Sequence, residues 1–132
     1  MRPLLNVDPS QEANMAAIDV DQLVTDVKTV ATQILNKDIT TVNGFSERQL
    51  TAIGQQAALV AEGIASGQIT KETREFFSAS LEKMVQNFLE TLQGLLWMTI
   101  EKLWNAMVGV IWKTINGAIA STGIALPVPV KV

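Results

Sequence analysis

The chain has 132 residues, of which 48% are hydrophobic and 17% are charged, and its formal net charge is −3. This length suits about one domain with a modest core. The hydrophobic fraction is high, and the charged fraction low, for a soluble monomer. A net negative chain without clusters of Lys and Arg lacks the basic stripe that nucleic-acid phosphates require. We therefore exclude direct binding to nucleic acid.

Three chemically useful residue types, Cys, His and Tyr, do not occur in the chain. It consequently lacks the usual thiol nucleophile, the usual general base near neutral pH, and the ligands of zinc, copper and haem sites. The eight glycines are scattered and form no phosphate-binding loop. We expect no enzymatic activity, no metal and no cofactor.

Residues 1–18 form an N-terminal segment that has one Arg but no apolar run of signal-peptide length. We expect no classical export signal. The longest charge-free stretches, 91–100, 103–112 and 114–130, are short or diluted by polar residues, whereas a membrane span needs about 18 uninterrupted apolar residues. A soluble assembly or a virion particle is therefore favoured over an integral membrane protein, and the compartment stays unknown.

Residues 19–69 are expected to form an acidic region of two amphipathic helices. In the first helix, aliphatic residues recur at 3-4-3-4 spacing from Val20 to Ile34, which is typical of a helix packed on another. Asp19 stands directly before this run, and the polar stretch that follows the run ends the helix by residue 44.

The second of these helices is marked at both ends. Ser46-Glu-Arg-Gln49 has the form of a capping box, in which Ser46 and Gln49 satisfy free backbone N–H groups at a helix start. The 3-4 spacing then continues from Leu50 to Ile64, and Gly67 is a natural residue just beyond a helix end. Both helices are interpreted as ordinary core-packing elements.

Residues 70–120 are expected to form one long apolar helix, over about 70–118. Thr70 suits its N-cap, and the pattern offers no break before Gly117 or Gly123. At 1.5 Å per residue such a helix is roughly 70 Å long, which exceeds the width of a domain of this mass. Helices longer than about 25 residues usually belong to coiled coils, membrane elements or helical arrays.

An apolar stripe follows this predicted helix in steps of 4-4-3, so that positions recur every eleven residues. A period of about 3.67 residues per turn favours straight or right-handed bundles over the left-handed heptad coiled coil. We predict that this stripe is an oligomer interface. Its members are Phe77, Leu81, Val85, Phe88, Leu92, Leu96, Leu103, Met107 and Val110.

The apolar arc widens to about 200° over residues 92–116 when they are placed at 100° per residue. Trp97 and Trp104 then lie along one border of the arc, and Trp112 lies beyond it on the polar flank. Trp at an apolar–polar border is typical both of protein interfaces and of membrane interfaces. These three residues are therefore predicted to mark a border toward a partner or a membrane.

Residues 121–132 are expected to form an extended tail, because Pro127 and Pro129 exclude a helix there. In an extended chain, alternate residues share one face. We predict that this face docks in the groove or on the sheet edge of a partner, in preference to fraying. The docking residues are Leu126, Val128, Val130 and Val132.

These patterns predict an all-α protein in which two shorter helices and one long helix form an oligomeric bundle with an extended tail. The predicted function is that of a non-enzymatic structural or assembly protein, acting as a homo-oligomer or as a subunit of a larger complex. Virions, phage tails and secretion apparatus contain components of this kind. Two alternatives stay open: a membrane-active protein whose residues 92–120 insert in a bilayer or line a pore, and a small helical adaptor.

Overall fold

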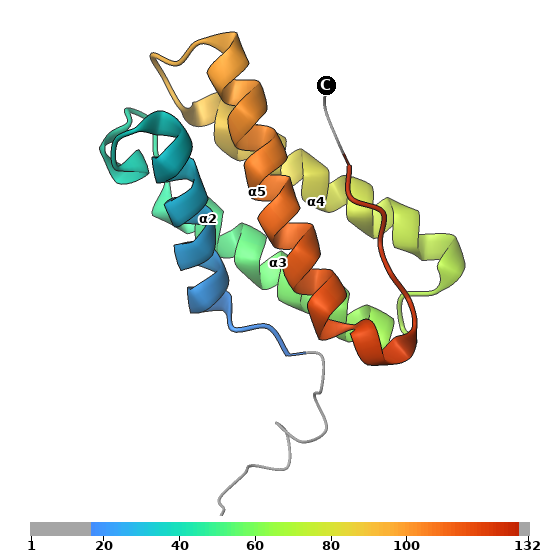
Figure 1. Ribbon diagram of the computed structural model, residues 1–132. Helices are drawn as coiled ribbons and strands as arrows, with labels where there is room; N and C mark the ends of the chain where they lie inside the picture. The colour runs from blue at the N-terminus through green and yellow to red at the C-terminus, as the bar shows by residue number, and fades with distance from the viewer. Residues whose placement is uncertain (1–16, 130–132) are drawn as a thin grey trace, which may run out of the picture.

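The computed structural model describes residues 17–129, which form an all-helical bundle without strands. The four α-helices of this part are α2 (Val20–Leu35), α3 (Glu47–Ala65), α4 (Lys71–Thr91) and α5 (Trp97–Ala118), with short 3-10 helices η1 (Ile39–Thr41) and η2 (Ala120–Thr122). Helix α5 contacts each of the other three helices, and Figure 1 shows it running through the middle of the bundle. The all-α fold class predicted from the sequence is confirmed.

Side-chain caps fix the starts of the first three helices where the sequence predicts them. The Asp19 carboxylate accepts a hydrogen bond from the backbone N–H of Gln22 at 3.1 Å, and α2 begins at Val20, directly after Asp19. Ser46 Oγ accepts from the backbone N–H of Gln49 at 3.1 Å, and Thr70 forms a capping box. Each cap satisfies a backbone donor that the first helical turn leaves free.

The ends of α2 and α3 are set by residues in the left-handed region. Asn36, with φ 60°, closes α2 and donates its backbone N–H to the carbonyl of Thr32. Gly67, with φ 82°, follows α3 and donates to the carbonyl of Ile64. Gly and Asn adopt this conformation at low cost, so the prediction that Gly67 ends the second helix is confirmed.

The core combines buried faces of all four helices, and those of α2 and α3 include residues that the 3-4 spacing predicts. No polar or charged side chain in residues 17–129 belongs to the buried class. The buried members of these two faces include Leu23, Val27, Leu50, Ile53, Ala57, Val60 and Ile64. Burial of each large aliphatic side chain contributes about 1.5–3 kcal/mol, so these faces supply much of the folding free energy.

The single helix predicted over residues 70–118 is wrong. The chain forms two helices, α4 and α5, joined by a turn at residues 92–96, in which Leu92 is extended and Gly94 has φ 79°. The turn sends α5 back across the other helices and buries most of the apolar arc inside the same chain. Breaking the helix loses a few backbone hydrogen bonds, at about 1 kcal/mol each, and the buried face gains more.

The connections gather at the two ends of the bundle. The α2–α3 connection and the α4–α5 turn lie at one end, and η2 lies at the other. After Gly123, which has φ 77°, the chain turns back and runs along α4 (Figure 1). The α4–α5 turn therefore sits at the end of the bundle away from the start of the tail.

Candidate docking surface

Three consecutive large apolar side chains stand on the surface where α5 begins. Leu96 is 77% exposed, Trp97 69% and Met98 68%. We call these three residues the apical patch. The other exposed large apolar side chains in residues 17–129 belong to other elements: Leu59 to α3, Phe76 to α4 and Val128 to the tail. The apical patch is therefore the feature of this surface that calls for a functional account.

The turn beneath the apical patch is held by the α2–α3 connection. Gln93 donates its backbone N–H to the carbonyl of Asn43 at 2.9 Å, and Leu92 is buried. Gly44 lies so close to the end of α4 that an added Cβ would overlap the carbonyl oxygen of Thr91. Two connections from different parts of the sequence thus support each other at this end of the bundle.

An aromatic contact reinforces the same support. The rings of Phe45 and Phe88 meet edge to face, with centroids 5.9 Å apart and planes at 85°. Phe88 is fully buried near the end of α4, and Phe45 belongs to the α2–α3 connection. Such an aromatic pair adds about 0.5–1.5 kcal/mol beyond its area. The apical patch consequently rests on a fixed base.

The charges closest in sequence to the apical patch nearly balance. Glu90 is the last charged residue before it, while Glu101 and Lys102 follow one turn later on α5. A hollow of about 100 Å³ lies beside the patch, lined by Trp97 together with Leu89, Glu90 and Glu101 among others. The patch is thus an apolar surface with a thin polar margin, without a cluster of basic side chains.

The first turn of α5 has no side-chain cap. Leu96 occupies the N-cap position and offers no oxygen to the backbone N–H groups that follow it. In α2, α3 and α4 that position is held by Asp19, Ser46 and Thr70. The free donors of α5 therefore require acceptors from outside the described chain, such as water or polar groups of whatever covers the patch.

The predicted oligomer interface is placed mostly in the core of the single chain. Among its members, Leu96 alone is exposed; Phe77 and Val110 are partly buried. The buried members are Leu81, Val85, Phe88, Leu92, Leu103 and Met107. As a contact between copies this set stays a prediction, and in this structure Leu96 is its one member with most of the side chain exposed to solvent.

The three tryptophans do not share one border. Trp97 lies on the surface as predicted, but Trp104 is only 4% exposed and Trp112 is fully buried. The placement of Trp112 on a polar flank is wrong, because the folded-back α5 is covered by helices on several sides. For Trp97, the role of a border residue toward a partner or a membrane stays a prediction.

The beginning of the tail docks on its own chain. Leu126 is buried, and both its backbone groups bind the Asn116 side chain: Asn116 Nδ2 donates to the Leu126 carbonyl at 3.0 Å and Asn116 Oδ1 accepts from its N–H at 2.7 Å. Val128, by contrast, is 45% exposed. Val130 and Val132 lie outside the described residues. Docking of this segment on a partner stays a prediction.

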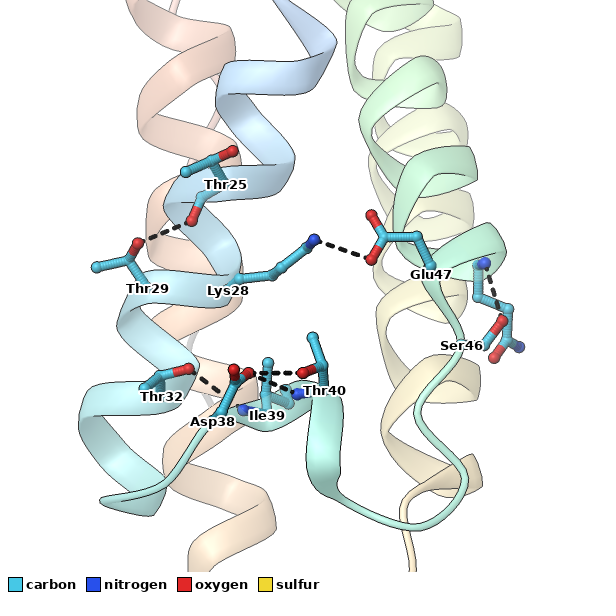
Figure 2. A network of polar contacts seen from close by, with 10 residues as sticks. Thr25, Lys28, Thr29, Thr32, Asp38, Ile39, Thr40, Ser46 and Glu47 are labelled. Carbon is cyan, nitrogen blue, oxygen red and sulfur yellow. Dashed lines mark hydrogen bonds and ion pairs between the residues drawn. The ribbon is translucent and has the colours of Figure 1, made fainter.

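A second polar cluster, shown in Figure 2, joins α2 to the connection that follows it. The Asp38 carboxylate accepts from the backbone N–H of Thr40 at 2.9 Å and from its hydroxyl at 2.8 Å. These two hydrogen bonds, the backbone one first, hold the pKa of Asp38 below its ordinary value. Lys28 Nζ and a Glu47 carboxylate oxygen form an ion pair 2.8 Å apart. The cluster therefore stabilises the α2–α3 connection and the pairing of α2 with α3.

Sequence reasoning missed two functional details. It passed over Gly94, the glycine that lets the chain turn beneath the patch, although this is the single glycine between Gly67 and Gly109. It also missed Asn116, because an amide that clamps backbone ten residues away leaves no local pattern. The run of apolar residues from Leu95 to Met98 was a visible signal, but it was absorbed into the helical stripe.

Metal-binding groups and membrane-spanning helices can be assessed in the described part of the chain. Within residues 17–129, no group of three or more acidic, His or Cys side chains is placed to hold a metal ion. None of the helices formed by these residues is long and apolar enough to cross a bilayer. Comparison of the chain with protein-family models, curated proteins and solved structures finds no match.

Proposed function

We propose that the protein is a non-enzymatic structural or assembly protein that joins a larger assembly through the apical patch. The observation that carries this proposal is the exposure of Leu96, Trp97 and Met98, each by more than two thirds, on one turn of chain. Contiguous exposed apolar patches on a folded chain are often interaction sites, and a central Trp is typical of the residues that dominate binding.

The size of the apical patch favours docking on a larger surface over a symmetric homodimer. With about 150–250 Å² for a large buried side chain, the three exposed side chains offer roughly 400 Å². A symmetric pair of such patches would bury about 800 Å² in total, below the about 1,200–2,000 Å² of stable interfaces. A subunit anchored on a larger surface therefore fits the patch better than a homodimer held by the patch alone.

The overlong helix that favoured a homo-oligomer is replaced by two helices. The turn at Gly94 brings most of the apolar arc of residues 92–116 into the core of the single chain. Self-association through the patch is accordingly expected to be weak and to rise with concentration. A small helical adaptor would use the same patch on a single dedicated partner.

The support beneath the patch strengthens the proposal. The hydrogen bond from Gln93 to Asn43 and the ring contact of Phe45 with Phe88 hold the turn before any partner arrives. A preformed surface loses little conformational entropy on binding, so even a small patch contributes most of its apolar free energy. This is the property that a docking element of a subunit needs.

Sedimentation velocity on the purified chain at rising concentration tests the proposal. We expect weak self-association that Leu96→Glu abolishes and that Leu59→Glu leaves unchanged, since Leu59 is comparably exposed but lies on α3. Circular dichroism confirms that both variants keep their helices. A wild-type chain and variants that remain identical monomers at every concentration would contradict assembly through the patch.

A further inference from the structure

We propose that the apical patch inserts into the interfacial layer of a zwitterionic phospholipid bilayer and so anchors the bundle to a lipid surface. This inference rests on the proposed function, because it takes the same patch as the working surface and names what that surface meets. The bundle itself stays outside the bilayer. Only the turn and the first residues of α5, from Leu95 to Met98, enter the lipid.

Shape and size favour a bilayer over a second protein. The patch is formed by residues next to one another in sequence, at one end of the bundle (Figure 1), so it is a tip and not a face. A protein partner would have to supply a groove around such a tip to reach the area of a stable interface. A bilayer needs no matched groove, because lipid chains rearrange around any apolar side chain that enters them.

The residue types suit the boundary between headgroups and acyl chains. Leu96 and Met98 are apolar side chains that gain free energy on leaving water. Trp97, which lies between them and is 69% exposed, belongs to the residue type that gathers at membrane interfaces, where its ring is apolar and its indole N–H stays wet. The order in the chain thus places an interfacial residue between two apolar ones.

The backbone sets how deep the tip can go. The first N–H groups of α5 have no side-chain cap from Leu96, and hydrocarbon offers them no acceptor. In the headgroup layer, phosphate oxygens, ester oxygens and water can accept hydrogen bonds from these N–H groups. Glu101 follows Trp97 by four residues, which is about 6 Å along the helix at 1.5 Å per residue. Insertion therefore stops within the roughly 5–10 Å that interfacial elements reach.

Charge selects the kind of lipid. Within residues 90–102 the chain carries Glu90, Glu101 and Lys102 and no other charge. Attraction to anionic lipid requires several Lys or Arg near the surface, and this segment has one. A zwitterionic surface such as phosphatidylcholine neither repels these carboxylates nor needs basic partners. We therefore expect insertion to be driven by the apolar side chains and to depend little on salt.

The experiment is flotation of the full chain with phosphatidylcholine vesicles, combined with tryptophan fluorescence. Trp104 and Trp112 are buried, so Trp97 is the exposed tryptophan and reports directly on the patch. We expect the chain to float with the vesicles and its emission to shift to shorter wavelength. Lipids brominated near the headgroup end of their acyl chains should quench Trp97 more strongly than lipids brominated near the chain ends.

Variants that keep Trp97 as the fluorescent reporter test which side chains of the apical patch contact the vesicle. Leu96→Glu and Met98→Glu should each lower the vesicle-bound fraction about tenfold or more and remove the blue shift. Leu96→Ala, which adds no charge and threatens folding less, should lower it several-fold. Phe76→Glu is the matched control, since Phe76 is 70% exposed on α4 and should leave binding unchanged.

The outcomes separate this inference from the proposed function. A wild-type chain that neither floats nor shows quenching of Trp97 overturns lipid insertion, and patch-dependent self-association in sedimentation would then still support the assembly function. Binding that Leu96→Glu does not weaken, or that requires anionic lipid and vanishes in high salt, also overturns it. If the patch variants match the wild-type chain in both flotation and sedimentation, both proposals fail.

Discussion

The close approach of two connections beneath the apical patch leads to a sharp prediction about Gly44. Replacing Gly44 with Ala adds one Cβ, which would overlap the carbonyl oxygen of Thr91, well inside the 3.0 Å that Cβ contacts keep. Because the obstacle is backbone and not a flexible side chain, the α2–α3 connection and the end of α4 must move apart by more than an ångström. Gly67→Ala is the matched control, since Gly67 has a similar φ of 82° but no atom within 4 Å of its added Cβ.

The two variants share one cost and differ in another. A left-handed conformation costs an Ala residue about 1–2 kcal/mol, and the restriction of the unfolded chain by Ala offsets part of this equally in both. Forcing atoms into an occupied space adds about 1–3 kcal/mol at Gly44 alone. We expect the free energy of unfolding to fall by roughly 1 kcal/mol for Gly67→Ala and by roughly 3 kcal/mol for Gly44→Ala.

Urea unfolding followed by circular dichroism measures this difference, and a thermal melt should show it as a gap of about 8 °C, at about 4 °C per kcal/mol for a chain of this size. Hydrogen exchange adds a local readout, because the amide of Gln93 donates to Asn43 across the same contact and should exchange faster in Gly44→Ala. Unfolding free energies that agree within about 0.5 kcal/mol for the two variants would show that the close approach contributes nothing, and the fixed base of the patch would go with it.

Three further predictions concern the core, the tail and pH. Leu103→Asp should lower the unfolding free energy by about 4 kcal/mol or more, because Leu103 is fully buried. The control is Asn87→Asp at an exposed position, which should change the unfolding free energy by under about 0.5 kcal/mol in the same melts. Asn116→Ala removes both hydrogen bonds of the tail and should cost about 1–3 kcal/mol and speed cleavage of the tail by proteases, with Asn87→Ala as the control. Folding lowers the pKa of Asp38, so its carboxylate stabilises the fold above its unfolded pKa and loses this effect as pH falls through the folded value. The stability gap between the wild-type chain and Asp38→Asn should therefore be constant above about pH 5 and shrink below about pH 4.

Local signals in the sequence predicted the first half of the fold well. The caps at Asp19, Ser46 and Thr70 and the end at Gly67 depend on hydrogen bonds within a few residues, so the residue types reveal them directly. The spacing predicts the buried face of α3 well and that of α2 in part: Leu23 and Val27 are buried, but Val20, Val30 and Ile34 are only half-buried.

The tail shows where local reasoning stops. Pro127 and Pro129 exclude a helix whatever the surroundings, so the absence of helix there is predictable. Burial differs within the predicted docking face, because Leu126 is buried and Val128 is 45% exposed. The clamp from Asn116 on α5, which holds both backbone groups of Leu126, is a contact of the tertiary fold that the local pattern does not reveal.

The eleven-residue register fails at one informative place. Leu81, Leu92 and Leu103 are all buried, as the register requires, although a turn separates them into different elements. In the neighbouring series, Val85 and Met107 are fully buried while Leu96 is the most exposed large apolar residue reported for residues 17–129. The spacing therefore predicts most of the side chains that are buried, but it does not show which member of the stripe the chain leaves exposed.

The reason for this failure is energetic, and it bears on function. One Gly inside a helix costs about 1 kcal/mol relative to Ala, which is too little to mark Gly94 as a break from the sequence. Burial of the α5 face decides instead, and that gain depends on helices far away in the chain. The same turn leaves Leu96, Trp97 and Met98 exposed, although apolar side chains gain free energy when they are buried. Local and global preferences usually agree in a folded chain, and a conflict between them is expected at working surfaces. That conflict falls on the apical patch, which lies at the turn that the helix prediction missed and whose residues we expect to bind.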